Sequence, residues 1–208
     1  MLHPVDRSNS LAGMAGENGV TEEETGLEKI ISLFKRDYEK TRLVYNEIVE
    51  GAEWVVNGEG VATQKHDGTC CKIEHGKLYK RFDAKRDKKP PEGFIPAQEP
   101  DPVTGHWPGW LLCDCSNPAD RWHFAAFPYD GCLPDGTYEL CGEKVQNNPE
   151  HVTGHVLIPH GSVALADAPR TFDELKAWFT DRDIEGIVWH HPDGQMVKIK
   201  KKDFGMKR

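Results

Sequence analysis

The chain has 208 residues, of which 26 are Lys or Arg, 34 are Asp or Glu, and 38% are hydrophobic. This length fits one globular domain, and the formal net charge of −8 argues against a generally basic nucleic-acid-binding protein. The sequence contains neither a long apolar run nor the apolar core of a signal peptide, so we expect a cytoplasmic protein with no membrane span and reduced cysteines.

The N-terminal part divides into a tail and a predicted helix. Residues 1–26 are rich in Gly, Ser, Asn and Glu and lack an apolar period, so they predict a flexible tail ahead of one domain over residues 27–208. The following apolar residues recur at helical spacing, which predicts a helix with one apolar stripe: Leu27, Ile30, Ile31, Phe34 and Tyr38.

From residue 53 onward, short strand-like runs alternate with Gly, Pro, Asp and Asn. A capping box from Thr171 to Glu174 predicts one later helix, and the proline-rich residues 84–108 predict a long loop. The pattern indicates an α+β domain of antiparallel sheets with a few helices. The predicted strands are 53–56, 60–64, 70–74, 77–82, 110–113, 122–127, 137–145, 155–158, 185–190 and 195–200, with 70–74 and 77–82, and 185–190 and 195–200, paired as hairpins.

Charge is unevenly distributed along this acidic chain. Residues 1–61 carry twelve acidic and six basic side chains, whereas residues 72–89 carry eight basic and three acidic ones. Residues 196–208 carry six basic and one acidic side chain. Two basic segments on an acidic protein indicate either a local site for a polyphosphate or nucleic-acid backbone, or simply solvated charged faces.

The tetrapeptide Lys65-His66-Asp67-Gly68 follows a predicted strand. A lysine held near a carboxylate by a glycine-containing turn can act as a nucleophile if its amine is neutral, and neighbouring cations and burial favour the neutral form. Because Asp-Gly is also a common turn, the same tetrapeptide can be an ordinary solvated turn.

Two further groups of charged residues lie in later strands. Lys198 and Lys200 share one strand face and can converge on one phosphate, while Glu185 in the paired strand can hold a divalent cation. The alternative is an exposed hairpin with a charged edge. Glu139 and Glu143 lie in another strand-like run. Their carboxylates need a partner there, which can be a metal, a ribose hydroxyl or solvent.

The order of these motifs resembles the covalent nucleotidyltransferase superfamily, which includes polynucleotide ligases and capping enzymes. Within it, the chain is most similar to the vertebrate-type ATP-dependent 5′-to-3′ RNA ligase family. The resemblance spans about residues 59–202 and rests on four segments: Lys65 to Cys71, Pro108-Gly109-Trp110, Ile158-Pro159-His160-Gly161 and Glu185 to His190. It implies a nucleotidyltransferase (adenylation) domain, here with no additional C-terminal β-barrel.

The resemblance implies that Lys65 attacks ATP to form lysyl-AMP, with Asp67, Lys198 and Lys200 as further catalytic residues. The neighbouring cations are expected to lower the pKa of Lys65. Mg²⁺ or Mn²⁺ is expected at Glu143 and Glu185. Where related enzymes stack an aromatic ring on adenine, this chain offers Ile158, Leu157 or His160. The implied ATP-binding residues are Gln64, Lys65, Gly68, Arg81, Glu143, Ile158, Glu185, Lys198 and Lys200.

The resemblance further implies an RNA substrate with a 5′-phosphate and a 3′-hydroxyl end, bound by a monomer. Arg81, Lys85 and Arg86 are the expected RNA-binding residues. Trp107, Trp110 and Trp122 can stack on bases or belong to the core. The alternatives are a nucleotidyltransferase that acts on DNA ends or transfers GMP, and a non-catalytic module that binds RNA ends.

Zinc-type donors occur in the middle of the chain, at Cys113, Cys115, His123, Cys132 and Cys141. Their spacing does not match the usual Cys-x-x-Cys knuckle, so we expect no zinc site there.

Overall fold

The computed structural model describes residues 30–85, 88–102, 104–129, 131 and 133–208; the predicted tail lies outside them. The domain is α+β with mostly antiparallel sheets and few helices, which confirms the predicted fold class. Among the described residues, no helix is long and apolar enough to span a membrane.

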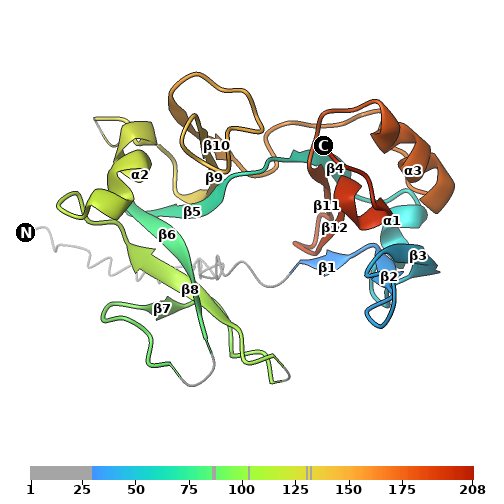
Figure 1. The fold of residues 1–208 in the computed structure, drawn as a ribbon, viewed down its shortest axis with the longest axis horizontal. Helices are drawn as coiled ribbons and strands as arrows, with labels where there is room; N and C mark the ends of the chain where they lie inside the picture. Colours follow the sequence, from blue (N-terminus) through green and yellow to red (C-terminus); the bar gives the residue numbers. More distant parts are fainter. Residues whose placement is uncertain (1–29, 86–87, 103, 130, 132) are drawn as a thin grey trace, which may run out of the picture.

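Two large sheets organise the molecule, and they lie toward opposite ends of it in Figure 1. The four-stranded sheet has the order β1 (Ile31–Ser32), β12 (Met196–Lys200), β11 (Gly186–His190), β4 (Val61–Lys65). The six-stranded sheet has the order β10 (His155–Pro159), β9 (Gly136–Gly142), β5 (Thr69–Glu74), β6 (Lys77–Ala84), β8 (Trp107–Leu112), β7 (Ile95–Pro96). A small separate sheet pairs β2 (Phe34–Arg36) with β3 (Val44–Ile48).

In the described part of the chain, three α-helices and two 3₁₀ turns accompany the sheets. The α-helices are α1 (Glu53–Val56), α2 (Arg121–Ala126) and α3 (Phe172–Thr180), and the 3₁₀ turns are η1 (Pro118–Asp120) and η2 (Lys201–Phe204). The helix predicted after Thr171 is therefore confirmed, but the capping box is not formed, because the Thr171 hydroxyl donates to the Glu174 carboxylate instead of capping the backbone. Both predicted hairpins are confirmed as well, and His75 and Gly76 in the first turn have the positive φ angles that such a tight turn requires.

The helix predicted to begin at Leu27 is wrong over its described part, which forms β1 and β2 instead. Leu33 donates its backbone N–H to the carbonyl of Lys198 and accepts from Val49, so partners far along the chain satisfy this backbone. Tyr38, on the expected apolar stripe, is 77% exposed. Pairing with β12 thus determines the structure of this segment, although its apolar residues also recur at helical spacing.

Two predicted strands are helices. Residues 53–56 form the single turn α1, in which the Glu53 carboxylate accepts a hydrogen bond from Gly51 N–H. Residues 122–127 largely form α2, which follows a 3₁₀ turn capped by Asn117 with Pro118 at its first position. Apolar runs this short cannot distinguish a buried strand from a helical turn.

The other predicted segments agree more closely with the structure. Strand β9 ends at Gly142, three residues before the predicted end, and β8 begins at Trp107. The predicted loop at 84–108 is largely irregular but contains β7. Trp122 is half-buried and packs against the core of the six-stranded sheet, which favours the core interpretation for it. Trp110, at 1% exposed, and the half-buried Trp107 lie on β8 outside that core.

Each large sheet buries one face. The four-stranded sheet packs apolar residues of β4, β11 and β12 against α1 and α3, around a core that includes Ile187, Trp189, Leu175 and Phe179. The six-stranded sheet packs a second core with residues of α2, around Cys71, Ile73, Leu78, Tyr138 and Leu140. Because side chains alternate along a strand, the polar residues between them lie on the opposite sheet faces.

Candidate active site

The ends of three strands bring the predicted lysines together. In the four-stranded sheet Lys65 lies opposite Gly186, and Gly186 lies opposite Lys200, so both lysines project from the same face. Lys198 lies two residues before Lys200 and shares that face. A Cβ on Gly186 would lie 2.3 Å from the Ile199 carbonyl oxygen, so only glycine allows β11 this close to β12.

Glu185 connects two of these lysines. Its Oε2 is 2.6 Å from Lys65 Nζ and its Oε1 is 2.6 Å from Lys200 Nζ, while its side chain is only 10% exposed. Burial alone would raise the pKa of Glu185, but the two ammonium groups more than offset this and lower it. Glu185 is therefore an ionised carboxylate shared by two cations.

The pKa of Lys65 is raised, contrary to the expectation that its neighbours lower it. Burial does favour the neutral amine, but the Glu185 carboxylate outweighs burial, and Glu139 and Asp67 add negative charge. The sequence predicted the cations near Lys65 but not the direct ion pair with Glu185. In the ligand-free state Lys65 is thus a protonated ammonium group.

Lys198 shows the opposite behaviour. Burial, together with the charges of Lys200 and Lys65, lowers its pKa to about 8. Among the residues that the structure describes, no carboxylate lies within ion-pair distance of the Lys198 ammonium. The three lysines therefore form a face with incompletely compensated positive charge, which is suited to an anion.

Asp67 and Gly68 connect this face to the six-stranded sheet. Gly68 N–H donates to Glu139 Oε1 at 3.0 Å, and Glu139 Oε2 lies 2.9 Å from His160 Nε2. A Cβ on Gly68 would lie 2.2 Å from the Leu140 carbonyl oxygen, so this position requires glycine. The pKa of Asp67 is raised, first by burial and then by the negative charge of Glu185.

Glu150 is a central residue that the sequence did not predict. Its carboxylate accepts hydrogen bonds from Asp67 N–H at 2.9 Å and from Arg208 at 2.7 Å, and lies 3.1 Å from His66 Nδ1. Burial would raise the pKa of Glu150, but these partners hold it at about 2. No sequence motif indicates Glu150, because it lies in a loop 83 residues after Asp67 and comes near Asp67 only through folding.

Other predicted residues lie away from the lysine face. Gln64 projects from the opposite side of β4 and contacts His66 and Glu150, so the structure does not bring its amide to the lysines. Glu143 is exposed and accepts from Gly154 N–H; Glu139 occupies the position near Lys65 instead. Lys85 is exposed, and Arg86 lies outside the described residues.

The remaining predicted residues form a row across the six-stranded sheet. Ile158 lies opposite Glu139, Glu139 lies opposite Cys70, and Arg81 lies opposite Trp110. The Arg81 guanidinium stacks over the Trp110 ring at 5.7 Å and donates to Asp83 at 3.3 Å. This row faces away from the core of its sheet, which makes it the second polar wall of the candidate site.

Both sheets also line a cavity of about 1200 Å³. Lys72 and Trp110 contribute from the six-stranded sheet, and Ile31 and Met196 from the four-stranded sheet. Lys65, Glu185 and Lys200 do not line this cavity, so the candidate site is defined by its ion pairs. Lysines paired with carboxylates can bind a polyphosphate and transfer a group at phosphorus.

Comparisons with known proteins return one recurring description. The family model described as RNA ligase 1 matches residues 131–208. RNA ligase 1 of Danio rerio is 27% identical, over 83% of this chain and 76% of that protein. RNA ligase 1 of Mus musculus and of Pongo abelii are 28% and 26% identical, each over 70% of this chain and 67% of the relative. The resemblance seen in the sequence motifs is thus confirmed.

Proposed function

We propose that this chain, which is similar to the vertebrate-type RNA ligase family, is an ATP-dependent RNA ligase that uses Lys65 as its nucleophile. The single observation that carries this proposal is the Glu185 carboxylate shared by Lys65 and Lys200, with Lys198 beside them. A non-catalytic RNA-binding module has no need for a half-buried lysine that is paired with one carboxylate and lies near two others at the end of a strand.

In the first step, Lys65 Nζ attacks the α-phosphate of ATP and displaces pyrophosphate, which leaves AMP on the lysine through a P–N bond. Lys65 must first lose a proton, and Glu185 Oε2 is its nearest acceptor at 2.6 Å. In the ligand-free state Glu185 opposes this loss, because it raises the pKa of Lys65. Substrate binding must therefore weaken the Lys65–Glu185 ion pair before the amine can react.

Lys198 and Lys200 supply positive charge to the triphosphate. Both lie on the face that carries Lys65, and Lys198 carries a charge that no ion pair in the described part of the chain compensates. A phosphate placed between them would favour their charged forms and stabilise the negative charge that develops during transfer.

We propose the acidic residues around Lys65 as the groups that would hold Mg²⁺ or Mn²⁺ once ATP is bound. Glu185, Asp67 and Glu139 offer carboxylate oxygens, the donors that these ions prefer. The raised pKa of Asp67 reflects, after burial, the nearby charge of Glu185, a repulsion that a cation would relieve. A bound ion would neutralise triphosphate charge. The sequence predicted Glu143 and Glu185 as the metal ligands. Because the charge of Glu139 acts on Lys65, as that of Asp67 does, we favour Glu139 over Glu143 as the ligand that accompanies Glu185.

In the later steps AMP passes from Lys65 to the 5′-phosphate of an RNA, and a 3′-hydroxyl displaces it to form the phosphodiester. The polar row with Arg81 and the exposed Lys85 on the neighbouring sheet offer positive charge for the RNA backbone. Ile158, opposite Glu139, is apolar and half-buried, which suits a contact with the adenine ring.

The test is a ligation assay with α-labelled ATP and Mg²⁺. Labelled AMP is expected on the protein and then on RNA that carries a 5′-phosphate, followed by joining to a 3′-hydroxyl end. RNA with a 5′-hydroxyl should accept no label, and Lys200→Ala should lose labelling while the exposed Lys202→Ala keeps it. Preference for GTP or DNA ends would contradict this assignment, as would RNA binding without labelling.

A further inference from the structure

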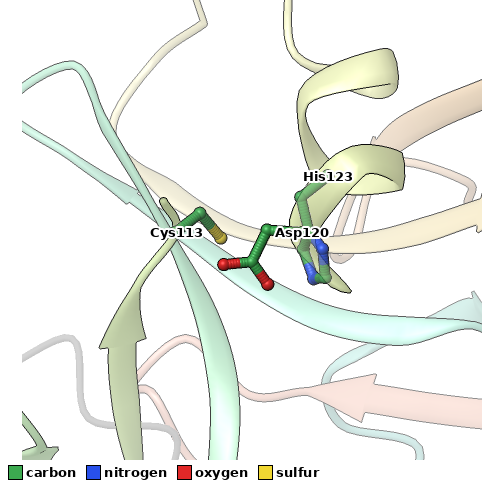
Figure 2. Close-up of side chains that lie close together, drawn as sticks. All are labelled: Cys113, Asp120 and His123. Atoms are coloured by element: carbon green, nitrogen blue, oxygen red, sulfur yellow. The ribbon is translucent and has the colours of Figure 1, made fainter. Parts of the chain in front are cut away.

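Three side chains of different types converge in the core of the six-stranded sheet. Cys113 follows β8, Asp120 ends η1 and His123 lies in α2, and all three are buried. Their ligand atoms lie within 4.8 Å of one another, and Figure 2 shows the thiol, the carboxylate and the imidazole pointing toward a common space. We propose that this cluster binds a zinc-type divalent metal ion through Cys113 Sγ, an Asp120 oxygen and a His123 ring nitrogen.

The independent observation behind this proposal is the imidazole of His123. His123 is only 9% exposed, and neither of its ring nitrogens has a hydrogen-bond partner in the described part of the chain. Buried polar groups are almost always paired, and an unpaired one commonly marks a missing water or ion. A metal bound to one nitrogen would resolve half of this deficit directly.

The donor set suits zinc. Thiolate, imidazole and carboxylate are the three ligand types that Zn²⁺ takes in proteins, whereas Mg²⁺ and Ca²⁺ avoid sulfur. Three protein ligands leave a fourth position for solvent. Asp120 and His123 are three residues apart at the start of a helical segment, which places both on one face.

Neighbouring groups already orient the carboxylate. Asp114 N–H donates to Asp120 Oδ2 at 3.0 Å, and Lys80 forms an ion pair with Oδ1. Such outer contacts typically fix ligands in metal sites. The Asp120 carboxylate would then contact both the metal and the Lys80 ammonium. The positive charge of Lys80 lowers the affinity of the cluster for the metal, compared with a site that lacks this charge.

The expectation of no zinc site rested on cysteine spacing and on a donor set that shares only Cys113 and His123 with this cluster. Cys115 is exposed, the Cys141 sulfur lies beside Gly68, and Cys132 lies outside the described residues. Asp120, which the cysteine spacing could not reveal, completes the cluster instead.

The cluster lies with Cys71 and Leu78 on the core side of its sheet, whereas Glu139 and Arg81 face the other way. We therefore assign the metal a structural role that ties β8 to α2.

The direct test is metal content. The full chain, purified without a metal-affinity tag, is loaded with Zn²⁺, dialysed, and analysed by elemental mass spectrometry. We expect one zinc per chain, lost in Cys113→Ser and His123→Ala and retained in Cys71→Ser, which alters a buried cysteine outside the cluster. Zinc that is absent from the wild-type chain, or unchanged in both ligand variants, would overturn the proposal.

A second measurement does not depend on variants that fold. Cobalt-loaded wild-type protein should show the intense visible bands of four-coordinate Co²⁺ and a near-ultraviolet thiolate-to-cobalt band. A spectrum of six-coordinate cobalt without the thiolate band would reject Cys113 as a ligand. Because neither readout measures ligase activity, failure of the zinc site and failure of the proposed RNA ligation are distinguishable.

Discussion

Lys65 and Glu185 form an ion pair, with Nζ 2.6 Å from Oε2, between the last residue of β4 and the residue before β11. This contact keeps the proposed nucleophile protonated until a ligand weakens it. The charge state of Lys65 is therefore coupled to the occupancy of the site.

Glu185→Gln should lower the pKa of Lys65 and at the same time slow the transfer of AMP to Lys65. Removing the carboxylate charge lowers the pKa of Lys65, because Glu185 is the main group that raises it. The labelling of Lys65 by an amine-reactive reagent, followed by peptide mass spectrometry, should shift to lower pH. AMP transfer should fall about 100-fold, since the variant also loses a proton acceptor and metal ligand.

Glu143→Gln is the matched control for that experiment. Glu143 is exposed and bonded to Gly154 N–H, so the pH dependence of Lys65 labelling should not change. An unchanged pH dependence in Glu185→Gln would contradict the role given to the ion pair.

Lys198→Met should stabilise the ligand-free protein while it impairs AMP transfer. Burial and two neighbouring ammonium groups lower the pKa of Lys198 from 10.5 to about 8. The unfolded chain therefore binds more protons between these pH values, so the wild-type protein gains stability as pH rises through them. At pH 7 the variant should be more stable by about 1–3 kcal/mol, from the size of this shift.

Urea denaturation at several pH values measures this difference. The advantage of Lys198→Met should be full below pH 8 and should shrink toward pH 10.5, where the wild-type lysine is neutral in both states. The exposed Lys202→Met should show no such trend. A destabilised Lys198→Met at pH 7 would contradict the unfavourable charge that the structure assigns to Lys198.

Glu150→Gln should weaken the loop that carries Asp67. The pKa of Glu150 is lowered to about 2, so its charge stabilises the fold above pH 4.5, and this contribution is lost as pH falls from 4.5 to 2. At pH 7 the variant should lose roughly 1–3 kcal/mol of unfolding free energy. Acid unfolding monitored by circular dichroism should show a smaller pH effect in the variant over that range, whereas the exposed Glu92→Gln should behave as the wild type.

Gly68→Ala should damage the site through backbone displacement. The new Cβ would lie 2.2 Å from the Leu140 carbonyl oxygen, so the loop must move, and the hydrogen bond to Glu139 is lost with it. We expect a cost of about 1–3 kcal/mol and at least a tenfold slower AMP transfer. Gly76→Ala meets no atoms but is strained by its φ of +70°; it should destabilise the hairpin without slowing AMP transfer.

The hairpins and the shared face of Lys198 and Lys200 could be predicted from the sequence, because both depend on local patterns. Strand alternation places Lys198 and Lys200 on one face, and turn residues fix the pairing of β11 with β12. The position of Lys65 at the end of β4 follows from the same alternation together with the resemblance to known ligases.

The remaining features depend on contacts that no local pattern encodes. The segment at Leu33 is a strand because Lys198 and Val49 satisfy its backbone groups. Glu150 reaches Asp67 from a loop with no motif of its own. The direction of the Lys65 pKa shift depends on a 2.6 Å contact, because the same sequence with Glu185 turned away would favour the neutral amine.

The most direct test of the account is to locate AMP on the protein after incubation with ATP and Mg²⁺, by mass spectrometry of peptides under conditions that preserve a P–N bond. We predict AMP on Lys65, and none in Lys65→Arg, which retains the positive charge. AMP on a different residue, or a folded protein that binds ATP and never carries AMP, would contradict the account.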